Sequence, residues 1–275
     1  MLLGIELLPA NAGDPAPDAW RALDALGPDW LALAEPPGAD NAEAVAMLQR
    51  ATRTPLLPHL TTRNRTPHDV AERVGAWRGA GVAQLLALRG DATGTCDLSR
   101  DQRLRSAREL VQLLLALDPE LEVWCAGYPE THPEAASPEA DLHALAAKVA
   151  AGAAGIICQF TFDADAFMRF RDRVTELGLD VPLIAGVLPV HDAAWLAGFA
   201  AHCGATLPKA VARALERWGD DAASLEAFGV EHACAMAATL VAAECDGLQF
   251  FTRNRAAQTV AIWDALRLPR ATRGR

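Results

Sequence analysis

Two stretches decide the fold: QLLALRGD at residues 84–91, and VWCAGYPETHPE at residues 123–134. In each, a short apolar run typical of a buried strand leads directly into a group of polar residues. Polar side chains gathered at the carboxyl ends of successive buried strands are how an α/β barrel builds a site. The single tyrosine of the protein, Tyr128, lies in the second group. The two stretches therefore predict parallel strands with functional residues at one end.

Similar apolar runs recur along the chain, near residues 2–9, 30–35, 55–61, 83–90, 122–129, 155–162, 181–189 and 247–252. Helical spacing of apolar residues separates them, as over residues 101–117. Strands that are apolar on both faces belong to parallel sheets covered by helices. Eight such strands alternating with helices predict an α/β fold, a (β/α)8 TIM barrel.

The connection between the seventh and eighth strands is the longest, over residues 190–246. It predicts three extra helices, near 191–203, 208–217 and 219–243, because proline and aspartate stand at their expected starts. We expect residues 1–268 to form a single catalytic domain. The basic residues 269–275 are expected to form a flexible, solvated tail.

Composition excludes several classes of function. The 35 acidic residues outnumber the 25 Lys and Arg residues and give a net charge of −10, which argues against a nucleic-acid partner. The six cysteines show no Cys-x-x-Cys pair and no zinc spacing, which indicates a reducing compartment and no structural metal. No basic start resembles a signal peptide, and no apolar stretch is expected to reach the roughly 18 residues of a membrane helix. We therefore expect a cytoplasmic protein without a membrane partner.

The carboxyl ends of the predicted strands supply the candidate site residues. They are Glu6, Glu35, His59, Thr61, Arg89, Asp91, Tyr128, Glu130, His132, Gln159, Thr252, Arg253 and Asn254. Glu6 stands in an apolar strand, where desolvation would raise the pKa of its carboxyl group and suit it to act as a general acid. The alternative is a glutamate satisfied by an arginine or a backbone amide.

Three other candidates have equally plain alternatives. Arg89 and Asp91 flank a glycine and could form a salt-bridged turn, and His59 could be a hydrogen-bonded core histidine. Asp141 and Lys148 lie two helical turns apart on one face, which could simply be solvated. The glycine-rich fingerprint of dinucleotide-binding sheets is absent from the sequence.

Eight ordered segments together resemble one known family. They are ELLP at 6–9, HLT at 59–61, LALRGD at 86–91, YPETHPE at 128–134, KVAAGA at 148–153, QFTFD at 159–163, GVLPV at 186–190 and FFTRNR at 250–255. In this order they resemble methylenetetrahydrofolate reductase, a barrel flavoprotein that reduces 5,10-methylenetetrahydrofolate to 5-methyltetrahydrofolate. The resemblance implies FAD as cofactor, NADH or NADPH as co-substrate, ping-pong hydride transfer and a homo-oligomer.

The resemblance also implies a role for individual residues. Glu6 matches the general acid of the family. The implied FAD-binding residues are His59, Leu88, Arg89, Gly90, Asp91, Tyr128, His132, Ala135, Asp141 and Lys148. The residues implied near the folate are Asp91, Gln159, Phe199 and Arg255.

The sequence departs from the family pattern in several of these places. Ala34-Glu35-Pro36-Pro37 replaces a Thr-Tyr-Gly-Ala segment that touches the flavin and the nicotinamide. Ala144 replaces an asparagine that helps to hold FAD, Trp195 replaces a polar folate contact, and Arg253 stands where leucine is common. Two alternatives therefore stay open: a divergent relative that lacks flavin or uses another folate or one-carbon adduct, and a non-catalytic flavin- or folate-binding subunit that needs a partner.

Overall fold

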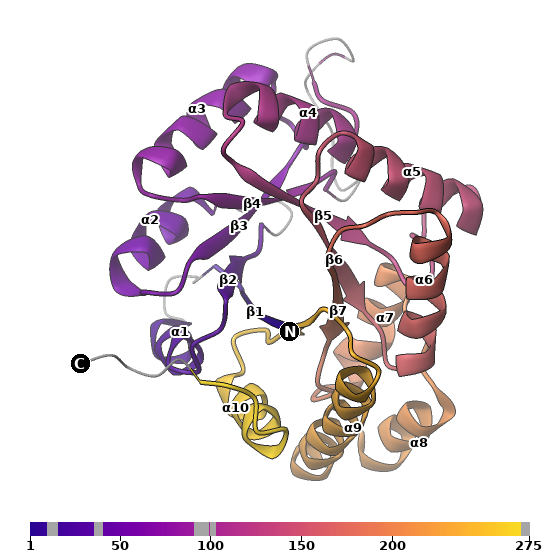
Figure 1. Cartoon of the computed structure of the whole chain (residues 1–275). Helices are drawn as coiled ribbons and strands as arrows, with labels where there is room; N and C mark the ends of the chain where they lie inside the picture. Colours follow the sequence, from indigo (N-terminus) through magenta and orange to yellow (C-terminus); the bar gives the residue numbers. More distant parts are fainter. Residues whose placement is uncertain (10–15, 36–40, 91–98, 100–102, 271–275) are drawn as a thin grey trace.

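The structure is a computed structural model that describes residues 1–9, 16–35, 41–90, 99 and 103–270. Eight parallel strands form a closed barrel in sequence order (Figure 1). They are β1 (Leu2–Leu7), β2 (Trp30–Leu33), β3 (Leu56–Thr61), β4 (Gln84–Leu88), β5 (Glu122–Gly127), β6 (Gly155–Phe160), β7 (Leu183–Val187) and β8 (Gly247–Phe251). The predicted (β/α)8 barrel is confirmed, and every strand except β3 ends one or two residues before its apolar run does.

Helices surround the strands in Figure 1. They are α1 (Ala16–Asp24), α2 (Ala42–Ala51), α3 (Pro67–Gly79), α4 (Ala107–Leu117), α5 (Pro138–Ala150), α6 (Ala164–Glu176), α7 (Ala193–Cys203), α8 (Lys209–Trp218), α9 (Ala222–Ala242) and α10 (Ala256–Ala265). The three extra helices between β7 and β8 are confirmed as α7, α8 and α9. The side chains of Asp192 and Asp221 cap α7 and α9, accepting hydrogen bonds from Trp195 N at 3.0 Å and Ser224 N at 3.1 Å.

The start predicted for the helix at residues 101–117 is wrong. Helix α4 begins at Ala107, because the side chain of Ser106 accepts a hydrogen bond from Glu109 N at 3.2 Å and so caps the helix. The Glu109 carboxylate in turn accepts from Arg105 N at 2.7 Å. The helical spacing of apolar residues therefore begins upstream of the helix itself.

Bulky side chains fill the inside of the barrel near the amino ends of the strands. The Trp30 and Trp124 rings lie 5.1 Å apart, and Trp30 Nε1 donates to Gln249 Oε1 at 2.8 Å. Gly4 leaves room for them, since a Cβ there would lie 2.1 Å from Gln249 Oε1. This packed layer closes the inside of the barrel below the carboxyl ends of the strands, which is the end where barrel active sites lie.

One expectation about the later part of the chain needs correction. Helix α9 is long and apolar enough to cross a membrane by length and composition, although no such segment was expected. One face of α9 packs on the barrel: a Cβ at its Gly229 would lie 1.9 Å from the Val190 carbonyl oxygen. At the start of the segment expected to form the tail, Pro269 O accepts from Trp263 Nε1 and Arg270 pairs with Asp264. Residues 271–275 lie outside the described residues.

Candidate active site

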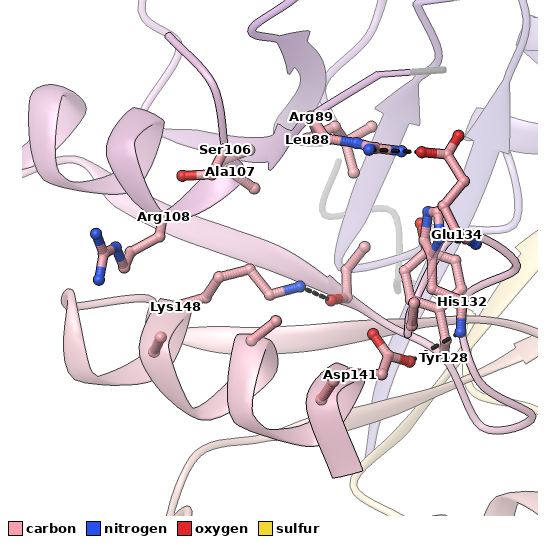
Figure 2. Close-up of a pocket in the computed structure, with 16 residues that line it drawn as sticks. Leu88, Arg89, Ser106, Ala107, Arg108, Tyr128, His132, Glu134, Asp141 and Lys148 are labelled. Atoms are coloured by element: carbon pink, nitrogen blue, oxygen red, sulfur yellow. Dashed lines mark hydrogen bonds and ion pairs between the residues drawn. The ribbon is translucent and has the colours of Figure 1, made fainter. Parts of the chain in front are cut away.

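A cavity of about 480 Å³ opens between the carboxyl ends of β4 and β5 and the helices α4 and α5 (Figure 2). Its lining includes seven of the ten residues implied for FAD: Leu88, Arg89, Tyr128, His132, Ala135, Asp141 and Lys148. The cavity combines apolar walls with a few charged groups, which is the usual make-up of a ligand site. Residues predicted from the strand ends and residues implied by the family resemblance therefore line the same cavity.

Helix α5 contributes both an anion and a cation to this cavity. Lys148 Nζ donates to the Ala126 carbonyl oxygen, and the Asp141 carboxylate accepts from His132 N at 2.8 Å. Both side chains point into the cavity in Figure 2 and are half-buried. Both side chains therefore have hydrogen-bond partners within the protein as well as access to the cavity. Between them the helix presents Ala140, Ala144 and Ala147 to the cavity, which leaves room for a flat group.

Arg89 pairs across the cavity mouth with Glu134, at 2.7 Å. This contact holds the pKa of the Glu134 carboxyl group below its usual range. Glu134 N also donates to His132 Nδ1 at 3.0 Å, and the His132 and Tyr128 rings meet edge to face at 4.5 Å. The described partner of Arg89 is thus a residue seven positions beyond β5. The alternative pairing with Asp91 falls outside the described residues, as does the folate role implied for Asp91.

Two residues implied for FAD lie outside the cavity lining. Gly90 has φ +82°, and a Cβ there would come within 3.0 Å of the Thr61 side chain, so the backbone of this turn requires glycine. His59 is buried in β3, and burial lowers its pKa to about 4. It is therefore neutral at physiological pH.

Glu6 lies on β1 at the mouth of the barrel, with 13% of its side chain exposed. Its carboxyl oxygen is 4.0 Å from His59 Nε2, and no arginine or backbone amide among the described residues reaches it. Burial without a partner raises the pKa of Glu6 to about 8. Since His59 is neutral above pH 4, the two groups form an uncharged pair at neutral pH. Glu6 accordingly holds a proton there, as its interpretation as a general acid requires.

A wall of aromatic rings begins beside Glu6. Phe251 is its register neighbour on β8, and the Phe251 ring lies 5.7 Å from that of Phe160. Phe160 stacks on Phe199 at 5.4 Å, and Phe199 stacks on Trp195 at 4.2 Å. We call these four residues the aromatic wall. The resemblance implied Phe199 near the folate and placed Trp195 where the family has a polar folate contact, but it did not predict that the two rings stack.

The other two residues implied near the folate flank this region. Gln159 is half-buried on β6, and its Oε1 accepts from Phe160 N at 3.0 Å, which leaves its amide nitrogen available. Arg255 is exposed at the amino end of α10. The turn before it is fixed by Asn254, whose Oδ1 accepts from Leu8 N at 2.9 Å and whose Nδ2 donates to Leu8 O at 3.1 Å.

Residues 21–267 match the family model for methylenetetrahydrofolate reductase. The chain belongs to the methylenetetrahydrofolate reductase family. It is 30% identical to the 5,10-methylenetetrahydrofolate reductase of Escherichia coli K12, over 96% of this chain and 90% of that protein. It is 26% identical to methylenetetrahydrofolate reductase (NADH) 1 of Arabidopsis thaliana, over 90% of this chain and 45% of that protein. The chain is therefore an oxidoreductase, of the family that reduces 5,10-methylenetetrahydrofolate.

Solved structures agree on the fold. An uncharacterised protein from Clostridium thermocellum, described as binding two copies of 5-methyl-5,6,7,8-tetrahydrofolic acid, superposes with a TM-score of 0.70 at 13% identity. The match covers 97% of this chain and 96% of that one. A 2,3-dimethylmalate lyase superposes with a TM-score of 0.51 at 14% identity, over 97% and 80% of the two chains. At these identities the likeness shows only the shared barrel.

Glu35, which replaces part of a cofactor-facing segment of the family, is not available at the mouth. Its side chain is 3% exposed and is bound by Arg65, by Thr61 N at 2.8 Å and by Arg73 at 3.7 Å. The carboxylate thus ties the end of β2 to β3 and α3. The expectation that Glu35 faces a ligand is wrong, while Pro36 and Pro37 lie outside the described residues.

Glu130 is also occupied by the protein itself. Its carboxylate accepts from Thr161 Oγ1 at 3.1 Å and from Thr206 N at 3.0 Å. It therefore joins the end of β5 to the end of β6 and to the segment between α7 and α8. Thr252 has a similar role, since its hydroxyl donates to the Glu6 carbonyl oxygen at 2.7 Å and holds β1 against the end of β8.

Replacing Glu35 by glutamine is expected to lower the free energy of unfolding by about 3 kcal/mol, because two largely buried arginines would lose their ionic contacts with this carboxylate. Urea denaturation followed by circular dichroism measures this change. Glu72→Gln is the matched control, since its side chain is 68% exposed and should change stability little. Equal unfolding midpoints for Glu35→Gln and the parent would show that this ion-pair cluster does not stabilise the strand ends.

Proposed function

We propose that the protein reduces 5,10-methylenetetrahydrofolate to 5-methyltetrahydrofolate with NADH or NADPH, through FAD in a ping-pong reaction, with Glu6 as the general acid. The observation that carries the proposal is the combination of a charged cavity beside β4 and β5 with a protonated carboxyl group at the adjoining barrel mouth. The family to which the chain belongs and the folate named for the Clostridium thermocellum protein support the same substrate class.

The residues of the cavity fit FAD. Lys148 uses one of its three N–H donors on the Ala126 carbonyl and has two left for a diphosphate. The alanines of α5 permit close approach of a flat or bulky group, and Asp141 presents an acceptor suited to ribose hydroxyls. Leu88 and Tyr128 provide the apolar surface between the cavity and the mouth.

When bound, the flavin supplies the atom that takes a hydride from the nicotinamide and passes it to the folate. The chain supplies the proton and the orientation. Glu6 stays protonated up to about pH 8 and donates to the folate nitrogen that leaves carbon as the five-membered ring opens. The partly exposed members of the aromatic wall, Phe251, Phe199 and Trp195, offer apolar surface to the flat parts of either substrate, and Gln159 offers an amide to a polar ring edge.

Restoring the family's asparagine at Ala144 is expected to tighten FAD binding. The side chain of Ala144 lines the cavity on α5, between Asp141 and Lys148, so an amide there can add one hydrogen bond. One such bond contributes about 0.5–1.5 kcal/mol, or about 2–10-fold in the dissociation constant. Fluorescence titration of apoprotein with FAD measures the change. An Ala144→Asn variant that binds FAD more weakly than the parent would indicate that the flavin does not pass this point.

The proposed function is tested first by the absorbance spectrum of the purified protein and by stopped-flow bleaching with NADH and with NADPH. A flavin spectrum that bleaches with either nucleotide is the expected result. A colourless protein that takes up no added FAD would favour a relative without flavin. A yellow protein that neither nucleotide bleaches would favour a binding subunit that requires a partner.

A further inference from the structure

Arg253, directly after β8, is held in an unusual position. The carbon of its guanidinium group lies 3.7 Å from the centre of the Trp195 ring, and Nη1 lies 3.1 Å from His191 Nε2. Its backbone has φ +48°, a left-handed conformation uncommon for arginine, in the turn that Asn254 ties to Leu8. Both of its neighbours in this contact come from the segment that starts α7. One face of the guanidinium thus lies on the Trp195 ring, and one of its N–H groups points at His191.

The hydrogen-bonding roles around His191 follow from the arginine. A guanidinium only donates, so His191 Nε2 must accept. The proton therefore resides on Nδ1, which donates to the Pro189 carbonyl oxygen at 3.2 Å. Burial lowers the pKa of His191, which keeps the ring neutral as this arrangement needs. The His191 ring also stacks on Trp195 at 5.5 Å, so that the support beneath Arg253 is rigid.

In the described part of the chain Arg253 forms no salt bridge with a carboxylate, although the negative charge of Asp192 is close enough to favour its charged form. The charged groups near it are Arg255 and Asp192. Asp192 is already engaged, since its carboxylate caps α7 through Trp195 N at 3.0 Å. Arg255 adds a second positive charge. Two cations close enough to affect each other, one of them aligned on an aromatic face, suit an anion with several oxygens.

The aromatic wall connects this cation to the reacting end of the site. Its rings run from Phe251, beside Glu6, through Phe160 and Phe199 to Trp195, on which Arg253 lies. A ligand whose reacting ring is at Glu6 and that runs along the partly exposed rings of Phe251, Phe199 and Trp195 brings its far end to Arg253. Both substrates of the proposed reaction carry anionic groups far from the reacting atoms, namely the carboxylates of the folate tail and the phosphates of NAD(P)H.

We propose that Arg253, aligned by Trp195 and His191, is a specificity-determining residue that binds the anionic end of the substrate. This inference rests on the proposed function and adds a residue to it. Leucine is common at this position in the family pattern, so Arg253 is a departure from that pattern. The guanidinium fork suits a carboxylate or a phosphate through paired N–H donors. It makes this contact without taking part in hydride or proton transfer.

The test is calorimetric titration of the purified protein, as isolated, with 5-methyltetrahydrofolate, NADH and NADPH in turn. Arg253→Leu is expected to weaken at least one of these ligands about 10–100-fold. Arg253→Lys keeps the charge without the planar fork and should recover only part of the loss. Arg213→Leu is the control, since Arg213 is an exposed residue of α8, and it should leave all three affinities within two-fold of the parent.

The pattern of losses identifies the anion. If only 5-methyltetrahydrofolate binds more weakly, Arg253 contacts the folate carboxylates. If both nucleotides bind more weakly, it contacts the diphosphate. If only NADPH binds more weakly, it contacts the extra phosphate of NADPH. Unchanged affinity for all three in Arg253→Leu overturns the inference while leaving the proposed function intact. A parent protein that binds none of the three overturns the proposed function and this inference together.

Discussion

Replacing Glu6 by glutamine is expected to leave flavin reduction by NAD(P)H unchanged and to slow reoxidation by 5,10-methylenetetrahydrofolate by about 10²-fold or more. Glutamine keeps the size and polarity of the side chain but cannot donate the proton that ring opening requires. Hydride transfer from the nicotinamide needs no acid from the protein. Stopped-flow absorbance separates the two half-reactions, with Glu216→Gln on the exposed face of α8 as the control. Equal loss of both half-reactions would indicate a structural role for Glu6.

The pH dependence of the reaction should also differ between the parent and the Glu6→Gln variant. Burial raises the pKa of Glu6 to about 8, so the parent holds the catalytic proton below this pH and loses it above. Folate-dependent reoxidation should therefore fall as the pH rises through about 8, and this fall should be absent from the residual rate of Glu6→Gln. A parent rate that is flat from pH 6 to 10 would exclude Glu6 as the proton donor.

Replacing Lys148 by alanine is expected to weaken FAD binding about 10–100-fold. The half-buried ammonium group faces the cavity from α5, and losing a charge-assisted hydrogen bond to a phosphate costs about 1.5–3 kcal/mol. Flavin retained after dilution and ultrafiltration measures the effect. Lys209→Ala is the matched control, because it removes the other lysine of the chain at an exposed position on α8. Equal retention by Lys148→Ala and the parent would place the diphosphate elsewhere.

Much of the fold and part of the site could be predicted from the sequence. Eight apolar runs were enough to predict the barrel, because parallel strands that are buried on both faces are apolar along their whole length instead of alternating with polar residues. A lone glutamate in such a run was enough to predict a raised pKa for the carboxyl group of Glu6, since burial alone raises it. The helical spacing of Asp141 and Lys148 placed them on one face of α5, and the structure turns that face into the cavity.

What the sequence did not reveal depends on partners that are distant along the chain. Glu35 looked available at a strand end, but its arginines come from α3 and from the segment before it. The Arg253–Trp195 contact joins residues 58 positions apart, and no local pattern predicts it. The start of α4 does have a local sequence signal, because Ser106 and Glu109 have the spacing of a helix-capping pair.

The central claim is that hydride and proton meet on the folate at the mouth of this barrel. Its most direct test is a single turnover without oxygen: the flavin is bleached with one equivalent of NADPH or NADH, the nucleotide is removed, and 5,10-methylenetetrahydrofolate is added. The account predicts that the flavin spectrum returns and that one equivalent of 5-methyltetrahydrofolate forms. A flavin that stays bleached, or that reoxidises without forming 5-methyltetrahydrofolate, would contradict it.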